Sequence, residues 1–473
     1  MEKTKDFIKK HLNDDVNKLA LSKFPEEIDK QFVIRQIQAR QVLSKKLPSW
    51  AENDELVFPK KLSLEQCSSE LTAKYKALLL STNPHEFPRK ISADLCDLVD
   101  EKEIRVNPCR SVEKNGILVD LTGGMGVDTS FLSDNFDKTY YVEMQEELCD
   151  IARHNFKILN KNIEVVNDNA EHFLTTCGEV DCIYLDPARR DEYGRKMVSL
   201  HDCSPDVAEL QDVLFEKAKT VMVKLSPMLD IDIVKKELKN IKEIHIVAVR
   251  NECKEILVIL GQQTTDNGQQ ELETQRRKDA KTQSGENSAT LSLCDSATSL
   301  TISATDLREK WNFSFTEDEE QNAEWTLADK VGRYLYEPGV AFMKAGCFKL
   351  LSQKYNLDKL HRNSHLYTSD ELVADFPGRI FEVINVVPFD KKAKKEITSI
   401  CQQTTDNGQQ TLEESSKLTA QSSRLKASVA ARNFPLSAEE LKKNLGLQDG
   451  GDFYIFGTTM KGEKKVVVLA KKV

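Results

Sequence analysis

Short apolar runs alternate with longer amphipathic segments between residues 109 and 261. The runs lie at Ile117–Asp120, Tyr140–Glu143, Ile163–Val166, Cys182–Leu185, Val221–Leu225, Ile244–Val249 and Ile256–Leu260. Helical patterns such as Gln145–Leu159 separate the earlier runs, and this alternation predicts an α/β, Rossmann-like domain with a parallel sheet of seven strands. Only Arg250–Glu255 joins the last two runs, which is too short for a crossover helix, so we expect them to form an antiparallel hairpin.

The segment before this domain has a helical pattern. We expect residues 1–85 to form an N-terminal helical region. Ser63 and Gln66 have the spacing of a capping box, which predicts a helix that runs to about Leu80.

A third folded region is predicted at residues 327–399 and resumes at residues 425–473. A helical pattern at Val340–Lys354 alternates there with short strand patterns, which indicates a small α+β unit. The strand patterns are Arg379–Val386, Phe453–Phe456 and Lys465–Leu469. Residues 424–473 contain ten Lys or Arg and five Asp or Glu, a balance of +5. A basic end of this kind is either a solvated surface or a nucleic-acid contact.

Two polar segments of low complexity interrupt the chain at residues 262–300 and 402–423. The nine residues QQTTDNGQQ begin both segments without change. Such compositions bury too little apolar surface to offset the entropy of ordering, so both segments are predicted to be disordered inserts. The repeated sequence has either a recognition role or no role. The simpler interpretation is that both segments are inserted sequence in surface loops that tolerate insertions.

Composition narrows the class of protein. The chain has 473 residues, which suggests two to four domains, and a net charge of −9, which argues against nonspecific coating of nucleic acid. It has no apolar run long enough to span a membrane, and its charged N-terminus lacks the apolar core of a secretory signal. The 11 cysteines form neither a C-x-x-C pair nor a cluster at zinc spacing. We therefore expect a cytoplasmic protein with reduced thiols, no metal site and no membrane contact.

A glycine-rich turn follows the first predicted strand. Gly123, Gly124 and Gly126 allow a cofactor to approach the backbone closely, as in nucleotide-binding turns. Asp120, at the end of the strand, either orients the turn and contacts the cationic end of a cofactor through water, or only caps the turn. Glu143 ends the second strand 23 residues later, where a carboxylate accepts both ribose hydroxyl groups.

Polar residues also follow the third and fourth strands. Asp168 or Asn169 is placed to accept the amino group of adenine, and the sequence leaves open which of them does so. The fourth strand leads into Asp186 and Pro187. A carboxylate there can accept the N–H groups of a target amine, although an Asp-Pro turn can also simply close a strand. We expect Asp186 and Pro187 to be catalytic, through positioning of the amine.

Three basic residues are candidate substrate contacts. Arg189 and Arg190 could contact phosphate or stack on a base, or they could pair with the acidic residues that follow them. Lys224 ends the fifth strand, at the edge where the active cleft is expected. The other interpretation of Lys224 is a solvated side chain.

The chain resembles the class I S-adenosylmethionine-dependent methyltransferases. Asp120–Thr129, Ala152–Phe156 and the Asp186-Pro187 pair carry the resemblance, and the motifs are most similar to those of RNA guanine-N2 methyltransferases of the trimethylguanosine synthase type. That group has Asp-Pro-Pro-Trp after the fourth strand, whereas this chain has Ala188 and Arg189 in the last two places. The aromatic residue that stacks on the base is therefore missing from its expected position.

The full arrangement is similar to a bacterial group of uncharacterised methyltransferases with a ferredoxin-like segment and a C-terminal THUMP-like domain. The segments that carry this similarity are Leu62–Glu70, Asp186–Asp191, Lys224–Asp230, Ser364–Leu372 and Arg432–Ser437. The resemblance implies a class I methyltransferase sheet at residues 109–261, a ferredoxin-like segment at 327–399 and a THUMP-like domain at 425–473. THUMP domains present tRNA to modification enzymes, so it also implies an RNA substrate.

These observations lead to one expected function and two rivals. We expect a methyltransferase that uses S-adenosylmethionine to methylate a base nitrogen of tRNA or rRNA. One rival is a methyltransferase that acts on a protein or a small molecule, and the other is a non-catalytic RNA-binding module. The intact Gly124, Gly126, Glu143 and Asp186 argue against the second rival.

Overall fold

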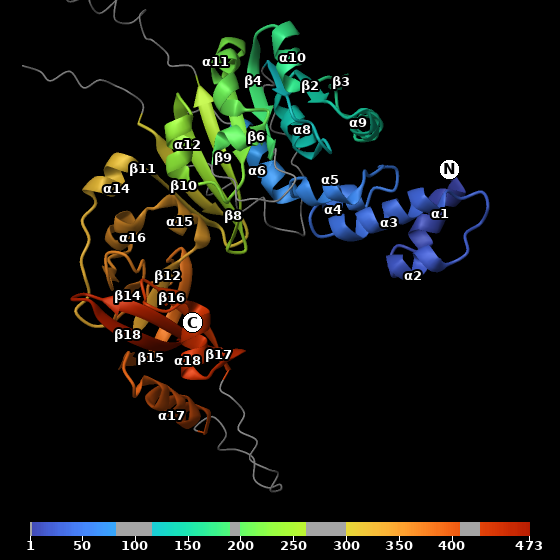
Figure 1. Ribbon diagram of the computed structural model, residues 1–473. Helices are drawn as coiled ribbons and strands as arrows, with labels where there is room; N and C mark the ends of the chain where they lie inside the picture. Colours follow the sequence, from blue (N-terminus) through green and yellow to red (C-terminus); the bar gives the residue numbers. More distant parts are fainter. Residues whose placement is uncertain (1, 82–115, 190–198, 262–298, 407–425) are drawn as a thin grey trace, which may run out of the picture. The chain divides into compact units, whose positions relative to one another are not determined.

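The computed structural model describes two compact units. The described residues are 2–81, 116–189, 199–261, 299–406 and 426–473. The first unit comprises Met1–Val247 and Lys254–Thr301, and the second comprises Ala248–Cys253 and Ile302–Val473. Figure 1 labels their helices and strands.

The first unit begins with helices. They are α1 (Glu2–Lys10), α2 (Val16–Leu21), α3 (Lys30–Leu43), α4 (Pro48–Ala51), α5 (Lys61–Gln66) and α6 (Glu70–Ser81). The prediction of one helix from Ser63 to Leu80 was wrong, because α5 ends at Gln66 and α6 begins at Glu70. Ser63 lies inside α5 and caps no helix. Residues 67–69 therefore connect two helices.

The seven predicted strands are all present. They are β1 (Ile117–Asp120), β2 (Lys138–Glu143), β3 (Ile163–Asn167), β4 (Val180–Leu185), β7 (Ala218–Leu225), β8 (Ile241–Val249) and β9 (Glu252–Gly261). Their order in the sheet is β8-β9-β7-β4-β1-β2-β3. The pairs from β3 to β7 are parallel, and β9 is antiparallel to β7. The α/β fold class is thereby confirmed.

Helices follow most of the parallel strands. They are α8 (Val127–Leu132), the 3₁₀ turn η2 (Ser133–Asn135), α9 (Glu146–Ile158), α10 (Ala170–Thr176), the 3₁₀ turn η3 (Leu200–Asp202), α11 (Val207–Lys217) and α12 (Ile231–Glu237). A short antiparallel pair, β5 (Ala188–Arg189) and β6 (Cys203–Ser204), follows β4. Cys149, Ala152 and Phe156 of helix α9 pack against Tyr141 of β2. This packing holds β2, the strand beside the glycine turn, in the core.

The expected hairpin joins β8 and β9. Arg250 and Asn251 connect the strands, and their φ angles are 54° and 59°. Two positive φ angles are typical of a two-residue type I′ turn, whose twist matches that of the strands. Among the described residues the strand order continues beyond β8 with β10 (Thr301–Asp306) and β11 (Trp311–Thr316), which gives nine strands where seven were predicted.

A second sheet forms most of the second unit. Its strands are β12 (Tyr334–Pro338), β13 (Asp358–Lys359), β14 (Tyr367–Ser369), β15 (Gly378–Pro388), β16 (Lys426–Arg432), β17 (Gln448–Met460) and β18 (Lys464–Lys472), in the order β13-β14-β12-β15-β18-β17-β16. Its helices are α14 (Glu317–Asn322), α15 (Val340–Ala345), α16 (Phe348–Tyr355), α17 (Ala393–Asp406) and α18 (Ala438–Leu445). The predicted helix Val340–Lys354 is broken at Gly346, where φ is 79°.

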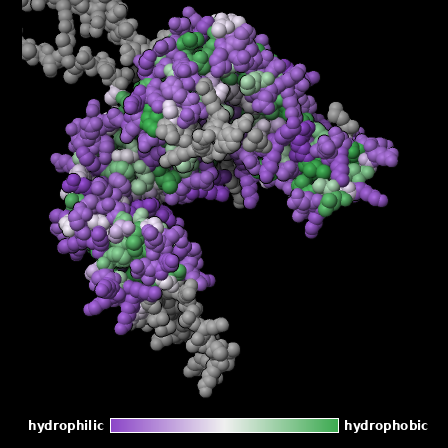
Figure 2. Space-filling model, in the orientation of Figure 1, coloured by the Kyte–Doolittle hydropathy of each residue, from purple (hydrophilic) through white to green (hydrophobic). Residues whose placement is uncertain are grey.

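The predicted inserts lie mostly outside the described residues. Of residues 262–300 the structure describes only the last two, and of residues 402–423 only the first five. Those five were predicted to belong to the insert, but they continue α17 to Asp406. None of the described helices has the length and apolar composition needed to cross a bilayer. The face shown in Figure 2 is mostly hydrophilic, with hydrophobic residues in small, separate groups.

Candidate functional site

A cleft of about 960 Å³ lies at the carboxyl ends of the parallel strands. Asp120, Glu143, Asp168, Asp186 and Lys224 border it, and they end or follow β1, β2, β3, β4 and β7 in that order. Ligands of open α/β sheets bind at this edge. The structure thus brings predicted site residues from five strands to one cleft. Residues 63 and 65–68 of the N-terminal region border the same cleft, which the sequence did not indicate.

The glycine turn packs against β2 and opens toward the cleft. The hydroxyl of Tyr141 donates a 2.6 Å hydrogen bond to the carbonyl of Gly124. A Cβ atom at Gly123 would lie 2.2 Å from the Tyr141 ring, so close packing alone requires glycine there. At Gly124, where φ is 53°, a Cβ atom would meet no atom of the described residues, its two chain neighbours apart, closer than 3.8 Å. The space above Gly124 is therefore available to a ligand.

The carboxyl group of Asp120 is hydrogen-bonded to the glycine turn and to helix α8. It accepts hydrogen bonds from the Thr122 N–H at 3.0 Å and from the Thr129 hydroxyl at 2.5 Å. Its side chain is nearly inaccessible, and burial raises the pKa of Asp120 to about 7 against the effect of these hydrogen bonds. Both oxygens have partners in the chain, as the capping interpretation expects, and the contact with a cofactor through water remains a prediction.

Glu143 lies beside the glycine turn. Its Oε2 accepts a 3.0 Å hydrogen bond from the Gly124 N–H, and its Oε1 accepts one of 2.9 Å from the Gln145 N–H. A carboxylate oxygen has two acceptor sites, so each can accept a further hydrogen bond from a ligand. The arrangement fixes the direction of the carboxylate relative to the turn.

Asp168 and Asn169 both border the cleft near the end of β3. Asp168 accepts a 2.8 Å hydrogen bond from the Asn169 N–H, and its second oxygen lies 2.7 Å from Nδ1 of His172. The Asn169 side chain caps α10 by accepting the His172 N–H at 2.7 Å. Each side chain keeps acceptor capacity, so both remain candidates for the adenine contact.

Asp186 and Lys224 form an ion pair at the cleft. The backbone N–H of Asp186 donates a 2.6 Å hydrogen bond to the Thr122 hydroxyl, which ties the end of β4 to the glycine turn. The Asp186 side chain is 34% exposed and that of Lys224 is 12% exposed. Burial opposes the charged form of Lys224, but Asp186, Asp128 and Glu255 outweigh it and raise the lysine's pKa. Two candidate residues that were predicted separately are therefore in direct contact.

The residues after Asp186 are only partly described. Pro187 and Ala188 border the cleft. The backbone of Arg189 pairs with Cys203 in β6, but its side chain lies outside the described part of the structure. Arg190 lies outside the described residues altogether, so the substrate roles predicted for both arginines remain predictions.

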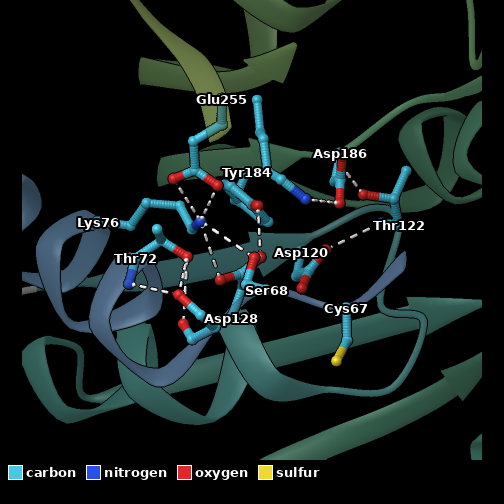
Figure 3. A network of polar contacts seen from close by, with 12 residues as sticks. Cys67, Ser68, Thr72, Lys76, Asp120, Thr122, Asp128, Tyr184, Asp186 and Glu255 are labelled. Carbon is cyan, nitrogen blue, oxygen red and sulfur yellow. Dashed lines mark hydrogen bonds and ion pairs between the residues drawn. The ribbon is translucent and has the colours of Figure 1, made fainter. Parts of the chain in front are cut away.

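A buried polar network adjoins the cleft, and sequence patterns did not reveal it (Figure 3). The ammonium group of Lys76 on α6 lies 2.8 and 2.9 Å from the two carboxylate oxygens of Glu255 on β9 and 3.3 Å from Oδ1 of Asp128 on α8. Oδ2 of Asp128 accepts hydrogen bonds from the Ser68 hydroxyl at 2.7 Å and the Tyr184 hydroxyl at 2.8 Å. The network joins the N-terminal region to the sheet that contains β4 and β9.

The pKa values of Asp128 and Glu255, the two acids of this network, are shifted in opposite directions. Burial opposes ionisation of Asp128, but the charges of Lys76 and Lys224 and two hydrogen bonds outweigh it, and the pKa of Asp128 is lowered. Burial dominates at Glu255 and raises its pKa despite the same two lysines. Asp128 is therefore the acid that the network holds most firmly in its charged form.

One cluster of potential metal ligands occurs among the described residues. The ligand atoms of His201, Asp206 and Glu209 lie within 4.8 Å of one another. Asp206 caps α11 by accepting the Glu209 N–H at 3.1 Å, and it lies 2.8 Å from Nδ1 of His201. Capping of a helix accounts for this geometry without an ion.

Family models match two parts of the second unit. A ferredoxin-like domain matches residues 334–377, and a THUMP-like domain matches residues 413–472. Both correspond to segments for which the sequence resemblance implied such domains. No curated protein matches the chain.

One solved structure matches nearly the whole chain. It is a "putative methyltransferase" from Porphyromonas gingivalis W83, with 29% sequence identity and a TM-score of 0.71 over 99% of this chain and 97% of that one. The resemblance inferred from sequence to class I methyltransferases with ferredoxin-like and THUMP-like domains is thereby confirmed.

Smaller proteins match about a third of the chain. A "putative methyltransferase" from Streptococcus mutans, in complex with SAH, has 18% identity and a TM-score of 0.24 over 31% of this chain and 88% of that one. A "putative rRNA-methylase" from Clostridium thermocellum has 14% identity and the same TM-score and coverage.

Proposed function

We propose that the protein is an S-adenosylmethionine-dependent methyltransferase that modifies a base nitrogen of RNA. The observation that carries the proposal is the position of the Asp186 carboxylate, which borders the same cleft as Gly124 and Glu143. A methyl donor bound at the turn and an amine bound at Asp186 would therefore meet in one cleft. The near full-length match to a protein described as a putative methyltransferase supports this function.

The cleft fits the proposed cofactor. The space above Gly124 accommodates a group that a Cβ atom would displace, and Glu143 has acceptor capacity for two hydroxyl groups. Asp168 or Asn169 would accept the adenine amino group. When bound, S-adenosylmethionine supplies an electrophilic methyl group on a positively charged sulfur.

Asp186 would hold the acceptor amine. Lys224 occupies its Oδ2, so its Oδ1 can accept an N–H of the amine and direct the nitrogen lone pair into the cleft. The amine nitrogen would form a new bond to the methyl carbon as the carbon–sulfur bond breaks. The electron pair of the broken bond would stay on sulfur, and the proton that the nitrogen loses would pass to solvent. Positioning would supply most of the rate.

Features of the second unit support RNA as the substrate. Arg379 and Arg432 both bind the buried carboxylate of Glu337, so two positive charges oppose one negative charge. The side chains of Arg379 and Arg432 are 34% and 39% exposed. Both residues border a hollow of about 640 Å³. The planar guanidinium group of arginine matches the geometry of a phosphate group, so two arginines in such a hollow are suited to bind phosphate. The THUMP-like match covers Arg432.

Transfer of labelled methyl groups tests the proposal. The purified protein and S-[methyl-³H]adenosylmethionine would be incubated with total RNA or total protein from a strain that lacks the gene. We expect label in tRNA or rRNA, and mass spectrometry of nucleosides would identify the methylated base. Asp186→Asn should abolish transfer while it leaves cofactor affinity within a few-fold.

The rival functions predict other results. Label in protein, with none in RNA, would favour a protein methyltransferase. A chain that binds RNA but neither S-adenosylmethionine nor S-adenosylhomocysteine would favour the non-catalytic RNA-binding module.

A further inference from the structure

Thr122, in the glycine turn, is hydrogen-bonded to both Asp120 and Asp186 (Figure 3). Its backbone N–H donates a 3.0 Å hydrogen bond to Oδ1 of Asp120, and its hydroxyl oxygen accepts one of 2.6 Å from the backbone N–H of Asp186. Thr122 and Asp186 both border the cleft. A residue of the turn proposed to bind the methyl donor is therefore bonded to the residue proposed to hold the acceptor amine.

The hydroxyl of Thr122 takes the place of a backbone acceptor at the end of two neighbouring strands. The pairing of β1 with β4 runs as far as Asp120 and Tyr184, and the Leu121 N–H donates a 3.0 Å hydrogen bond to the Tyr184 carbonyl. Beyond this point β1 leads into the glycine turn and the ladder ends. The backbone N–H of Asp186 still needs an acceptor, and the Thr122 side chain provides it.

Asp186 is constrained in three ways. Pro187 follows it, and a residue before proline is restricted mainly to extended backbone conformations. Lys224 pairs with Oδ2 of its side chain. Thr122 accepts its N–H, and this constraint lies in the glycine turn. The bond between Thr122 and Asp186 therefore relates the position of the acceptor amine to the position of the methyl donor.

On the basis of the proposed function, we infer that Thr122 is a positioning residue for methyl transfer, which holds the Asp186 carboxylate in place relative to the methyl donor. A misplacement of a reacting group by about 1 Å can lower the rate about 100-fold. Loss of the Thr122 hydroxyl should therefore slow the transfer step. The contacts that bind the cofactor should stay intact, because the hydroxyl oxygen bonds to the end of β4 and not to the glycines or Glu143.

Single-turnover methyl transfer tests this inference. The full chain, in excess over total RNA from a strain that lacks the gene, would be mixed with saturating S-[methyl-³H]adenosylmethionine at several protein concentrations. Thr122→Val keeps the shape of the side chain but removes the hydroxyl, and we expect its maximal rate to fall at least about tenfold. Its half-saturating protein concentration and its dissociation constant for S-adenosylhomocysteine should stay within about threefold of the unaltered values. A partly unfolded variant would instead need more protein to reach the same maximal rate.

Two variants serve as controls. Thr122→Ser keeps the hydroxyl and should keep at least about a third of the maximal rate. Thr139→Val makes the same change at a buried threonine near the start of β2, away from the cleft, whose hydroxyl has no hydrogen-bond partner among the described residues. It should not change the rate. If Thr122→Val does not fold, Thr122→Ala takes its place and must show the same loss.

The outcomes separate this inference from the proposed function. An unchanged maximal rate in folded Thr122→Val, or an equal loss in Thr122→Ser, would overturn the inference while the function stands. A loss of cofactor affinity as large as the loss of rate would also overturn it, because Thr122 would then serve to bind the cofactor. Failure of the unaltered protein to transfer methyl groups to RNA would overturn the proposed function itself.

Discussion

At the scale of single residues, the burial of Asp120 links the glycine turn to stability. Burial raises its pKa to about 7, whereas an aspartate in an unfolded chain has a pKa of about 3.9. Between these values the folded protein holds a proton that the unfolded chain has released, so the free energy of unfolding falls as the pH rises. A shift of about three units corresponds to about 4 kcal/mol at most.

Asp120→Asn should remove this pH dependence. The amide oxygen can still accept the Thr122 N–H, and the Thr129 hydroxyl can accept from the amide nitrogen. As the pH rises from 5 to 8, the free energy of unfolding of the variant should increase relative to that of the unaltered protein by an amount on the order of 2–4 kcal/mol. Urea unfolding of both proteins at several pH values measures this difference. A difference that does not change with pH would show that Asp120 is already ionised in the fold.

Gly124→Asn tests the space above the glycine turn. Asparagine tolerates a positive φ better than other side chains, so the variant should fold, but its side chain would occupy the cleft. We expect its affinity for S-adenosylhomocysteine to fall at least about tenfold, or about 1.4 kcal/mol. Gly346→Asn is the matched control, because Gly346 also has a positive φ and open space around its Cβ position but does not border the cleft. Undiminished affinity in folded Gly124→Asn would exclude the turn from the site.

Sequence patterns placed candidate site residues at the cleft wherever a strand end fixes their position. Asp120, Glu143 and Asp186 were predictable because the carboxyl ends of parallel strands meet at one edge. The contact of Asp186 with Lys224 was not, because strand order decides which ends are neighbours. Lys76 and Asp128 were missed for another reason. A lysine or aspartate on a helix usually faces solvent, and only tertiary packing shows that these two are buried.

At the scale of elements, helix α6 is fixed to strand β9 of the first unit's sheet by a buried ion pair. Lys76 of α6 meets Glu255 of β9, and the side chains are 0% and 3% exposed. Removal of Lys76 alone leaves two buried carboxylates, Glu255 and Asp128, without the cation that they share, which costs about 3–5 kcal/mol. Replacement of Lys76 and Glu255 together leaves only one of these carboxylates and is less costly. The break at residues 67–69, which the sequence did not predict, separates α6 from α5, and Ser68 in this break donates a hydrogen bond to Asp128.

A double-mutant cycle tests this attachment. Lys76→Met should destabilise the first unit by about 3 kcal/mol or more, and Glu255→Met should destabilise it less, because Lys76 keeps its pair with Asp128. The double variant should lose less stability than the sum of the two single losses. Lys61→Met is the control, because its pair with Glu65 is exposed and worth about 0.5 kcal/mol or less. Additive losses in the double variant would show that the two residues are not coupled.

Fluorescence can follow the first unit alone. Of the three tryptophans, Trp50 lies in the first unit, and Trp311 and Trp325 lie in the second. Denaturant unfolding of each variant, in a background with phenylalanine at positions 311 and 325, therefore reports the stability of the unit that contains α6.

At the scale of the whole molecule, the C-terminal segment cannot be removed as a separate piece. Strands β16, β17 and β18 share one sheet with β12 and β15, and β15 pairs with β18 along its length. Truncation at residue 425 would take three strands from that sheet and expose its core. The sequence indicated the strands of both segments, but their common sheet depends on pairs such as Phe381 with Lys472 and Pro388 with Val466, which lie 91 and 78 residues apart in the chain. Local patterns do not encode such distant pairing.

Point variants therefore test whether this segment captures RNA. Lys464, Lys471 and Lys472 are exposed on β18, and their joint replacement by glutamine should weaken RNA binding and reduce its dependence on salt, because each lost phosphate contact lowers the slope by about 0.7–0.9. The control replaces three exposed lysines of the helical region, Lys10, Lys23 and Lys45, and so changes the net charge equally. Filter binding to tRNA across a salt titration should separate the two triple variants. Equal slopes for both variants would mean that overall charge, and not the THUMP-like segment, determines RNA affinity, and would return the protein or small-molecule substrate to consideration.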